Sequence, residues 1–258
     1  MTSQSLPLSI AIITLNEDAN LGRCLESVKA IASELVIVDS GSTDKTEEIA
    51  KRYGAQFMYN PWPGHVKQKN HALQQCTQPW VLSLDADECL TPELAKAIIV
   101  LFQHGEPACD GYELNRRTEY LGEWIWHAWY PEWRLRLVKR EKGLWQGRDP
   151  HDKLTVKGTN TKLKGGDFLH YTYRDLTHHM AQTVKYARIG AQAALDRGDT
   201  FKGRKLLLSP LGRVLRMLII RHAWRDGWRG MIITFSSAMS AFLKYAYMYE
   251  YAKTKNKV

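Results

Sequence analysis

The sequence lacks paired cysteines and long apolar segments, and each absence excludes a class of protein. Its four cysteines, in 258 residues, have no Cys-x-x-Cys spacing, which argues against a zinc site and against a disulfide framework. The longest uncharged stretch, residues 230–243, contains four Ser or Thr residues and is shorter than the roughly 18 residues of a spanning helix. The polar segment Met1–Pro7 has no signal-peptide core. We therefore expect a cytoplasmic protein.

Acidic residues are scarce in the C-terminal part of the chain. Residues 1–110 carry 8 Lys and Arg against 14 Asp and Glu, whereas residues 111–258 carry 28 against 13. The imbalance is steepest over residues 176–258, with 15 basic and 4 acidic side chains. Such an asymmetry predicts an anionic partner for this part: nucleic acid, acidic lipid or a phosphorylated acceptor.

The first hundred residues alternate short β-rich apolar runs with helical spacings. This order favours a mostly parallel sheet flanked by helices, in which ligands lie beyond the carboxyl ends of the strands. Less regular strands follow, and the pattern is helical and basic from Asp175 onward. A further helix is predicted to begin at a capping box formed by Asp44 and Glu47 and to end at Gly54. The other predicted helices are 20–31, 65–75 and 92–103. The predicted strands are 8–13, 35–38, 55–59, 80–84, 111–115, 134–138 and 168–171.

Asp85-Ala86-Asp87 follows the predicted buried strand Trp80–Leu84. Two carboxylates at the end of a strand are suitable ligands for a divalent cation such as Mg²⁺ or Mn²⁺, which prefers oxygen and is commonly shared with phosphate. The alternative is a turn whose acids cap the next helix, which begins with Thr91-Pro92.

Polar residues also follow two other predicted strands. Asp39 ends the strand 35–38 and precedes a Ser- and Gly-rich turn, so its carboxylate could accept from an imide or a ribose hydroxyl. Thr14 and Glu17 follow the first strand, where Glu17 could meet a ribose or a base. The alternatives are a tight turn with a helix cap for Asp39 and an exposed loop acid for Glu17.

Together these strand-end motifs resemble glycosyltransferase family 2, the inverting nucleotide-sugar transferases with the GT-A fold. The resemblance rests on Ile12–Glu17, Val36–Asp44 and Leu84–Glu88, and the order of three motifs is more specific than any one of them. Within the family the chain is similar to lipopolysaccharide-core β-1,4-glucosyltransferases, on the segments Gly64–Leu73 and Pro150–Leu154.

The resemblance implies a role for each of five residues around a UDP-sugar donor. Thr14, Glu17 and Asp39 would bind the uridine. Lys69 and Asn70 would lie near the donor, where the lysine could pair with phosphate. The alternative for the lysine is a solvated basic helix face.

The resemblance also implies a divalent metal, Mg²⁺ or Mn²⁺, as the cofactor. Asp85 and Asp87 would hold the donor diphosphate through this metal, which neutralises charge as the leaving group departs. His170 could reach the metal or the diphosphate, although a single His after a strand is more often structural.

An inverting transfer needs a base for the proton of the acceptor hydroxyl. Asp152 is the candidate, although relatives often have Glu after the preceding His, so this carboxylate is one methylene shorter. Asp149 and Asp167 are rival candidates that could equally be turn residues. The aromatic segment Trp124–Trp133 fits a sugar-binding wall, hydrophobic core or a lipid-facing lid, and we expect more than one of these uses.

The C-terminal segment Leu206–Ile233 intersperses arginines with apolar residues and tryptophans, which predicts a pair of amphipathic helices. Such helices could lie on the anionic inner-membrane surface. They could also pack on the catalytic domain with a solvated basic face. The arginines are Arg213, Arg216, Arg221, Arg225 and Arg229.

The sequence therefore predicts an α/β GT-A catalytic domain over residues 1–175 and a basic helical extension over 176–258. The catalytic domain would divide into a nucleotide-sugar half, about 1–108, and an acceptor half, about 109–175. The expected reaction moves a hexose, glucose from UDP-glucose, onto a heptose of the lipopolysaccharide inner core. The enzyme would work at the cytoplasmic face of the bacterial inner membrane as a peripheral protein.

Two other functions remain open at this stage. A nucleotidyltransferase could use the same sheet and metal on a sugar phosphate, and it would release pyrophosphate instead of UDP. A basic protein without catalysis could bind nucleic acid or membrane, but no nucleic-acid motif is recognisable and the strand-end acids would have no role. We therefore expect no nucleic-acid partner.

Overall fold

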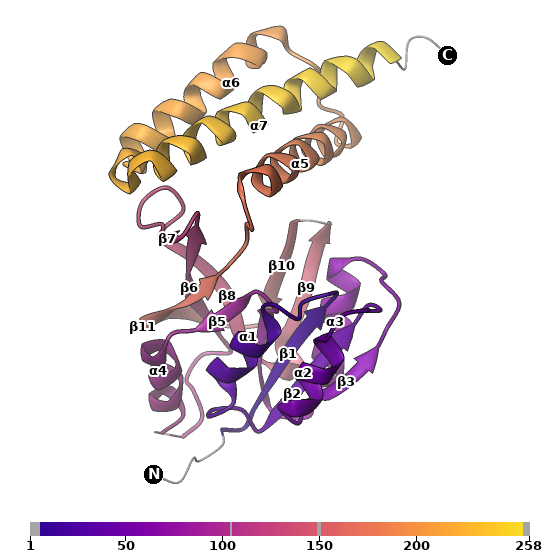
Figure 1. The fold of residues 1–258 in the computed structure, drawn as a ribbon, viewed down its shortest axis with the longest axis vertical. Coiled ribbons are helices and arrows are strands. Elements are labelled where there is room, and N and C mark those ends of the chain that lie inside the picture. The colour runs from indigo at the N-terminus through magenta and orange to yellow at the C-terminus, as the bar shows by residue number, and fades with distance from the viewer. Residues whose placement is uncertain (1–5, 104, 149–150, 255–258) are drawn as a thin grey trace. The chain divides into compact units, whose positions relative to one another are not determined.

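The computed structural model describes residues 6–103, 105–148 and 151–254 (Figure 1). The chain forms two compact units. Residues 1–117 and 132–170 make the first, and residues 118–131 and 171–258 make the second. The second unit thus includes an aromatic segment that is far from the C-terminal helices in the sequence. None of the helices in the described ranges is both long enough and apolar enough to cross a membrane.

A mixed sheet is the centre of the first unit. Within the described ranges it has nine strands in the order β3-β2-β1-β4-β8-β6-β11-β5, with β7 paired to β6. Strands β1 to β4 are parallel, and β8, β6 and β5 join by antiparallel pairing. The strands are β1 Leu8–Thr14, β2 Glu34–Asp39, β3 Gln56–Tyr59, β4 Trp80–Asp85, β5 Glu88–Leu90, β6 Gly111–Tyr120, β7 Glu123–Trp124, β8 Glu132–Lys139 and β11 Asn160–His170.

Four helices cover this sheet. The core on one face joins apolar residues of β1 and β4 to α1, α2 and α4, and α3 packs on the opposite face. Residues such as Ile10, Ile12 and Leu82 are fully buried, as expected for strands covered on both faces. The helices are α1 Leu21–Val28, α2 Thr46–Arg52, α3 His65–Gln75 and α4 Pro92–Gln103.

The strand and helix pattern predicted for residues 8–103 is confirmed, with two corrections at helix starts and ends. The helix α1 ends at Val28 instead of Ile31. The predicted capping box of Asp44 and Glu47 is wrong, because the Asp44 carboxylate accepts from the N–H of Thr46, 2.9 Å away, and α2 begins there. The N-cap at Thr91 is confirmed, since its hydroxyl accepts from the N–H of Leu94 at 3.2 Å.

The later strands are longer than their sequence pattern predicts, and one hairpin was missed. Strands β9 Gly143–Arg148 and β10 His151–Val156 pair antiparallel, with Leu154 opposite Trp145. Both of these residues are buried and pack on the α3 face of the sheet. The hairpin is hard to predict from the sequence because few of its side chains are apolar, and Trp145, Leu154 and Val156 are the ones that pack on this core.

Close packing fixes β11 against α4. A side chain on Gly166 would place its first carbon 2.3 Å from the backbone nitrogen of Leu94, so only glycine fits there. Strand β11 also pairs with β5, which sets His170 opposite Glu88. This packing determines where the carboxyl end of β11 lies in the sheet.

Three long helices, drawn from orange to yellow in Figure 1, dominate the second unit. The helix α7 packs against both α5 and α6. Asp175 caps α5 by accepting from the N–H of His178 at 2.7 Å. A π-helical turn, Arg216–Ile220, and a 3₁₀ turn, Ala223–Asp226, follow α6. The helices are α5 Leu176–Asp196, α6 Gly203–Leu215 and α7 Gly227–Thr254.

The aromatic segment 124–133 contributes to the core of this second unit. Ile125 and Ala128 are buried there, and Trp129 lies against Tyr120 with ring centroids 5.4 Å apart. The Asp226 carboxylate accepts from the backbone N–H groups of three consecutive residues, 126–128, at 2.8–3.0 Å. The expected core role is thus present, while Trp126 remains 48% exposed.

Candidate active site

The parallel register brings three predicted site residues to one edge of the sheet. Thr14 pairs with Asp39, and Ile13 pairs with Asp85, so the carboxyl ends of β1, β2 and β4 lie side by side. The Thr14 hydroxyl donates to the Asp39 carboxylate at 2.7 Å. The sheet therefore assembles the strand-end cluster that the sequence predicts.

Asp39 has no spare acceptor position in this structure. One carboxylate oxygen accepts from the hydroxyls of Thr14 and Ser42, and the other accepts from the N–H groups of Gly41 and Ser42, all at 2.6–2.7 Å. Burial alone would raise the pKa of Asp39, but these hydrogen bonds outweigh it and lower the pKa below its ordinary value. A carboxylate offers about four acceptor positions. A ligand donor could bind Asp39 only if a hydroxyl turned away.

The loops that follow β1 and β2 are joined by hydrogen bonds. Asn16 has a left-handed backbone, with φ of 55°, and its side-chain oxygen accepts from the N–H of Thr43 at 2.9 Å. The N–H of Glu17 donates to the Thr46 hydroxyl at 2.9 Å. Burial raises the pKa of Glu17, and the nearby carboxylates, Asp87 first among them, raise it further. An electropositive ligand at this edge would relieve that repulsion.

Lys69 connects two acidic residues that are 67 positions apart in the sequence. Its ammonium group, on a side chain only 7% exposed, lies 2.8 Å from Asp85 Oδ1 and 2.8 Å from Asp152 Oδ2. The same nitrogen lies 4.4 Å from the centroid of the Trp145 ring. Burial lowers the pKa of Lys69, but the two carboxylates, Asp85 foremost, outweigh burial and raise it. The lysine is thus held charged between the strand β4 and the hairpin β9–β10.

A second buried cation, Arg136 on β8, holds the other side of Asp85. Its Nη2 lies 3.2 Å from Asp85 Oδ2 and 2.7 Å from Glu88 Oε1. Glu88 is 1% exposed and also accepts from the N–H of Asp85 at 3.0 Å. Burial raises the pKa of Asp85, but Lys69 and Arg136 outweigh it and lower the pKa far below its ordinary value. Asp85 is therefore ionised, with both oxygens paired to cations.

Asp87, the residue before β5, lies beside His170 at the end of β11. His170 Nε2 is 3.4 Å from Asp87 Oδ2, and the buried Nδ1 of His170 has no hydrogen-bond partner among the described residues. A carboxylate oxygen and an imidazole nitrogen form a donor pair that suits Mn²⁺ or Mg²⁺ with phosphate oxygens completing the shell. Among the described residues, no three or more His, Cys, Asp or Glu side chains lie together in a way that could hold a metal ion. Asp87 and His170 could supply two ligands of a metal whose remaining ligands are phosphate oxygens.

Two residues predicted to act in the site, Asn70 and Asp167, form hydrogen bonds within the protein. The Asn70 amide both donates to and accepts from the backbone of Trp145, at 2.8 and 2.9 Å, and so attaches α3 to β9. Asp167, a rival for the base, accepts from the Asn115 amide at 2.8 Å and pairs with Arg117 at 3.4 Å. Asp149, the other rival, lies outside the described residues. Of the two candidates within the described residues, Asp152 is the one beside Lys69.

Sequence reasoning missed Arg136, Trp145 and the pairing role of Glu88. Arg136 is a charged residue inside the run Leu135–Val138, and a cation in a buried strand signals a buried carboxylate partner. That signal was available from the sequence. The partner itself was not, because Glu88 and Arg136 meet only when β4, β5 and β8 assemble.

Comparison with known proteins identifies the family. Residues 9–160 match the family model of glycosyl transferase family 2. The chain is 34% identical over 256 residues to the lipopolysaccharide core biosynthesis glycosyltransferase LpsC of Rhizobium meliloti (strain 1021), covering 95% of this chain and 93% of that protein. It is 28% identical over 260 residues to the uncharacterized glycosyltransferase RT0209 of Rickettsia typhi, covering 96% and 89%.

The chain belongs to glycosyltransferase family 2, and it is a glycosyltransferase with the GT-A fold and a helical C-terminal extension. Similar solved structures include residues 1–349 of TarS from S. aureus, at 13% identity and a TM-score of 0.48, covering 96% of this chain and 91% of that one. Another is glucosyl-3-phosphoglycerate synthase from Mycobacterium tuberculosis, at 16% identity and a TM-score of 0.47, covering 76% and 81%.

The buried pair of Arg136 and Glu88 generates a prediction about stability. Arg136→Met should lower the free energy of unfolding by about 3 kcal/mol, because it removes the nearer cation of the buried Glu88 carboxylate and leaves only Arg116, 3.7 Å away, to pair with it. Adding Glu88→Gln should recover part of this loss. Urea denaturation followed by circular dichroism would measure both.

The matched control is Arg134→Met on the same strand, where the arginine side chain is 48% exposed and pairs with Glu132. An exposed ion pair contributes about 1 kcal/mol or less, so this variant should be nearly neutral. Equal losses for the two arginine variants would contradict the buried-pair argument.

Proposed function

We propose that this glycosyltransferase inverts the anomeric centre of a hexose, glucose from UDP-glucose, as it transfers it to a heptose of the lipopolysaccharide inner core. The observation that carries the proposal is the position of Lys69, which contacts Asp85 on one side and Asp152 on the other. A diphosphate position and a candidate base thus lie within reach of one lysine. Asp87 is two residues from Asp85 on the same turn, and His170, at the end of β11, lies beside Asp87.

The donor would enter at the ends of β1 and β2. Thr14, Glu17 and Asp39 would bind the uridine, with Asp39 accepting from the base after the Ser42 hydroxyl turns away. Asn70 would act near the donor by holding the Trp145 backbone in place. The hydrogen bonds that lower the pKa of Asp39 keep it ionised and ready to accept.

The diphosphate would lie over Asp85, Asp87 and His170 with a divalent cation. When bound, that cation stabilises the negative charge that builds on the departing UDP. Asp87 and His170 would hold it directly, with Asp85 next to them. Arg136 and Glu88 fix the orientation of Asp85, so the position of this edge does not depend on the donor.

Asp152 would take the proton from the acceptor hydroxyl as that oxygen attacks the anomeric carbon and UDP leaves on the opposite side. Lys69 holds Oδ2 of Asp152, while Oδ1 accepts no hydrogen bond from the part of the chain that the structure describes. That free oxygen is the atom that would receive the proton. Lys69 positions the Asp152 carboxylate, which is one methylene shorter than the Glu of relatives. This contact supports Asp152 as the base.

The lipopolysaccharide acceptor is supported by the name of the relative from Rhizobium meliloti, a lipopolysaccharide core biosynthesis glycosyltransferase that is 34% identical to this chain over 256 residues. Transfer to a lipid-anchored acceptor would require the enzyme to reach a membrane surface. The nucleotidyltransferase and non-catalytic alternatives do not agree with the family to which the chain belongs.

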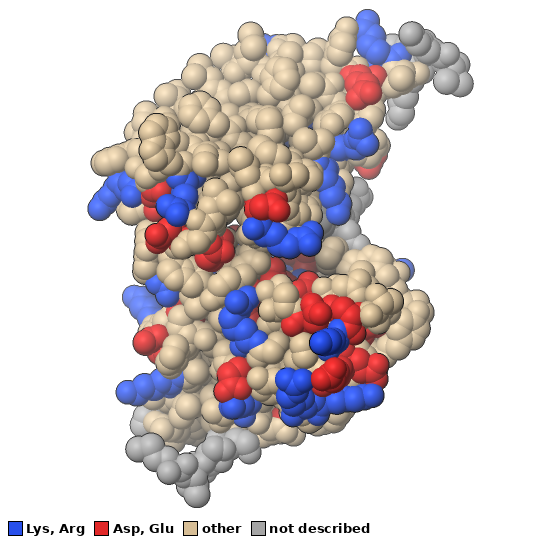
Figure 2. Space-filling view, in the orientation of Figure 1, with Lys and Arg blue, Asp and Glu red and all other residues tan. Residues whose placement is uncertain are grey.

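The second unit has a surface that fits this location, which we name the apolar stripe. It follows α6 and the π-helical turn at intervals of four residues, where Leu207, Leu211, Leu215 and Ile219 are 72, 55, 48 and 63% exposed. On the face drawn in Figure 2, a broad area of the helical unit carries no charged side chain. Between residues 203 and 225 the chain has six basic residues and no acidic residue. An anionic membrane would match both properties.

Removal of the metal ligand should abolish transfer. Asp87→Ala should reduce UDP-hexose turnover by at least about a thousandfold while leaving the thermal unfolding temperature nearly unchanged, because the Asp87 side chain is partly exposed. UDP release in the presence of Mg²⁺ or Mn²⁺ would measure turnover. Near-normal turnover of a folded variant would refute the metal role.

Replacement of the base should separate binding from chemistry. Asp152→Asn should reduce kcat by about a hundredfold or more but leave UDP binding within a few fold of the parent protein. Asp167→Asn serves as the comparison, since its carboxylate is engaged by Asn115 and Arg117. If Asp167→Asn lost turnover with its fold intact and Asp152→Asn did not, the base would be Asp167.

Polar substitutions on the apolar stripe should release the protein from membranes. Leu207→Gln with Ile219→Gln should weaken binding to phosphatidylglycerol vesicles by about a thousandfold, because each of the two buried side chains contributes on the order of 2 kcal/mol. Sedimentation with vesicles would measure this. The control is Val100→Gln with Leu176→Gln, two residues that are 43 and 44% exposed outside the stripe. Equal binding by the stripe and control variants would contradict the membrane role.

A further inference from the structure

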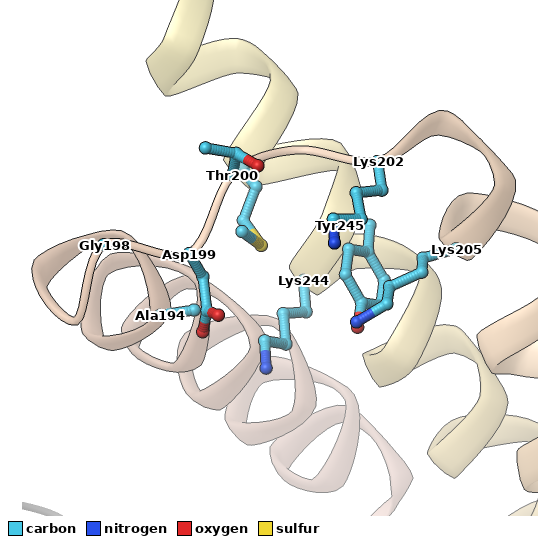
Figure 3. Close-up of a pocket in the computed structure, with 9 residues that line it drawn as sticks. Ala194, Gly198, Asp199, Thr200, Lys202, Lys205, Lys244 and Tyr245 are labelled. Atoms are coloured by element: carbon cyan, nitrogen blue, oxygen red, sulfur yellow. The ribbon is translucent and has the colours of Figure 1, made fainter.

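A small pocket in the second unit is not used by any step of the proposed reaction. It lies where the turn between α5 and α6 meets α7, and its volume is about 270 Å³. Ala194 and Met248, both 1% exposed, form an apolar base. Figure 3 shows that polar side chains come to it from three segments of the chain. These are Asp199, Thr200 and Lys202 from the turn, Lys205 from α6, and Lys244 and Tyr245 from α7.

Three of the lining side chains are lysines without an acidic partner. None of Lys202, Lys205 and Lys244 forms an ion pair with any residue in the described ranges. The carboxylate of Asp199 also lines the pocket, but it lies 3.4 Å from the guanidinium of Arg197. The lysines therefore leave uncompensated positive charge around a small volume, and their mutual repulsion would fall if an anion bound there.

A tyrosine holds two of these lysines around the pocket. The ammonium groups of Lys205 and Lys244 each lie 5.8 Å from the centroid of the Tyr245 ring. In Figure 3 the side chain of Lys205 ends near the Tyr245 hydroxyl. The Tyr245 and Thr200 hydroxyls add two neutral donors to the lining.

The start of α6 provides a second, independent preference for an anion. This helix has thirteen residues, its N-cap Lys202 makes no side-chain cap, and its first turn contains no acidic residue. Its first N–H groups thus have no side-chain acceptor, and the helix dipole favours negative charge at this end. The same segment carries two of the three lysines.

We propose that this pocket binds a phosphate group, either as a free phosphate monoester or as the headgroup of an anionic lipid. The volume lies just below the range of about 300–1,000 Å³ typical of pockets for larger ligands, which suits a small anion. Ammonium groups, hydroxyls and helix N–H groups are the donors that phosphate oxygens accept from. The site belongs to the helical unit alone and does not depend on which sugar the enzyme transfers.

Inorganic phosphate is the first probe. Titration of the full-length protein, at constant ionic strength with chloride as the reference anion, should show saturable binding and a rise in the thermal unfolding temperature. Lys205→Gln with Lys244→Gln should weaken phosphate binding by about tenfold or more, because two charge-assisted hydrogen bonds are lost. Circular dichroism would verify that the variant is folded.

The control is Lys164→Gln with Lys185→Gln, which changes the net charge equally at two exposed residues outside the pocket. This variant should bind phosphate as the parent protein does. Equal weakening in both double variants, or no binding of phosphate beyond that of chloride, would overturn the proposal.

Vesicles distinguish the two sources of the phosphate. Binding to phosphatidylcholine vesicles would be compared with and without phosphatidic acid, for the parent protein and both double variants. If the phosphatidic acid effect falls only in the pocket variant, the phosphate is that of a lipid headgroup. If free phosphate binding falls while vesicle binding is unchanged, the ligand is a soluble phosphate monoester.

Discussion

The rest of the site depends on the two ion pairs that the buried ammonium group of Lys69 forms. It lies 2.8 Å from both Asp85 and Asp152, and so joins the end of a parallel strand to a hairpin added late in the chain. Without this cation two carboxylates would face each other in a partly buried space. Arg136 repeats the arrangement on the other side with Glu88. Asp85, Asp152 and Glu88 are stable close together because each of them pairs with a Lys or Arg side chain.

In the structure, the two aspartates of the Asp85-Ala86-Asp87 motif have different partners, which the motif alone does not show. Asp85 is occupied by Lys69 and Arg136, while Asp87 faces His170. The first aspartate therefore organises the edge of the sheet, and the second is the one left with a metal-type donor beside it. The acceptor positions of Asp39 are likewise all used, by the Thr14 hydroxyl on β1 and by Gly41 and Ser42 in the loop that follows it.

The helical unit differs from the first unit in its ion pairing and in the exposure of its apolar side chains. Most of its Lys and Arg side chains form no ion pair among the described residues, and the apolar stripe is exposed along α6 and the π-helical turn. Both features favour anionic surfaces or small anions over a further protein core. The aromatic segment, for which both a sugar-binding and a core use were expected, is held in this unit by Asp226 and by packing on Tyr120.

The sequence by itself determined the first four strands, their helices and the strand-end residues, because buried parallel strands and helix caps leave strong local patterns, as at Trp80–Asp85 and Thr91. It also determined the family through those same motifs. Only the tertiary structure decided that Lys69 joins Asp85 to Asp152, that Glu88 needs Arg136, and that Asn70 holds Trp145. The physical reason is that these contacts are made by strands and helices far apart in the chain, and no local pattern encodes which distant charge a buried group will meet.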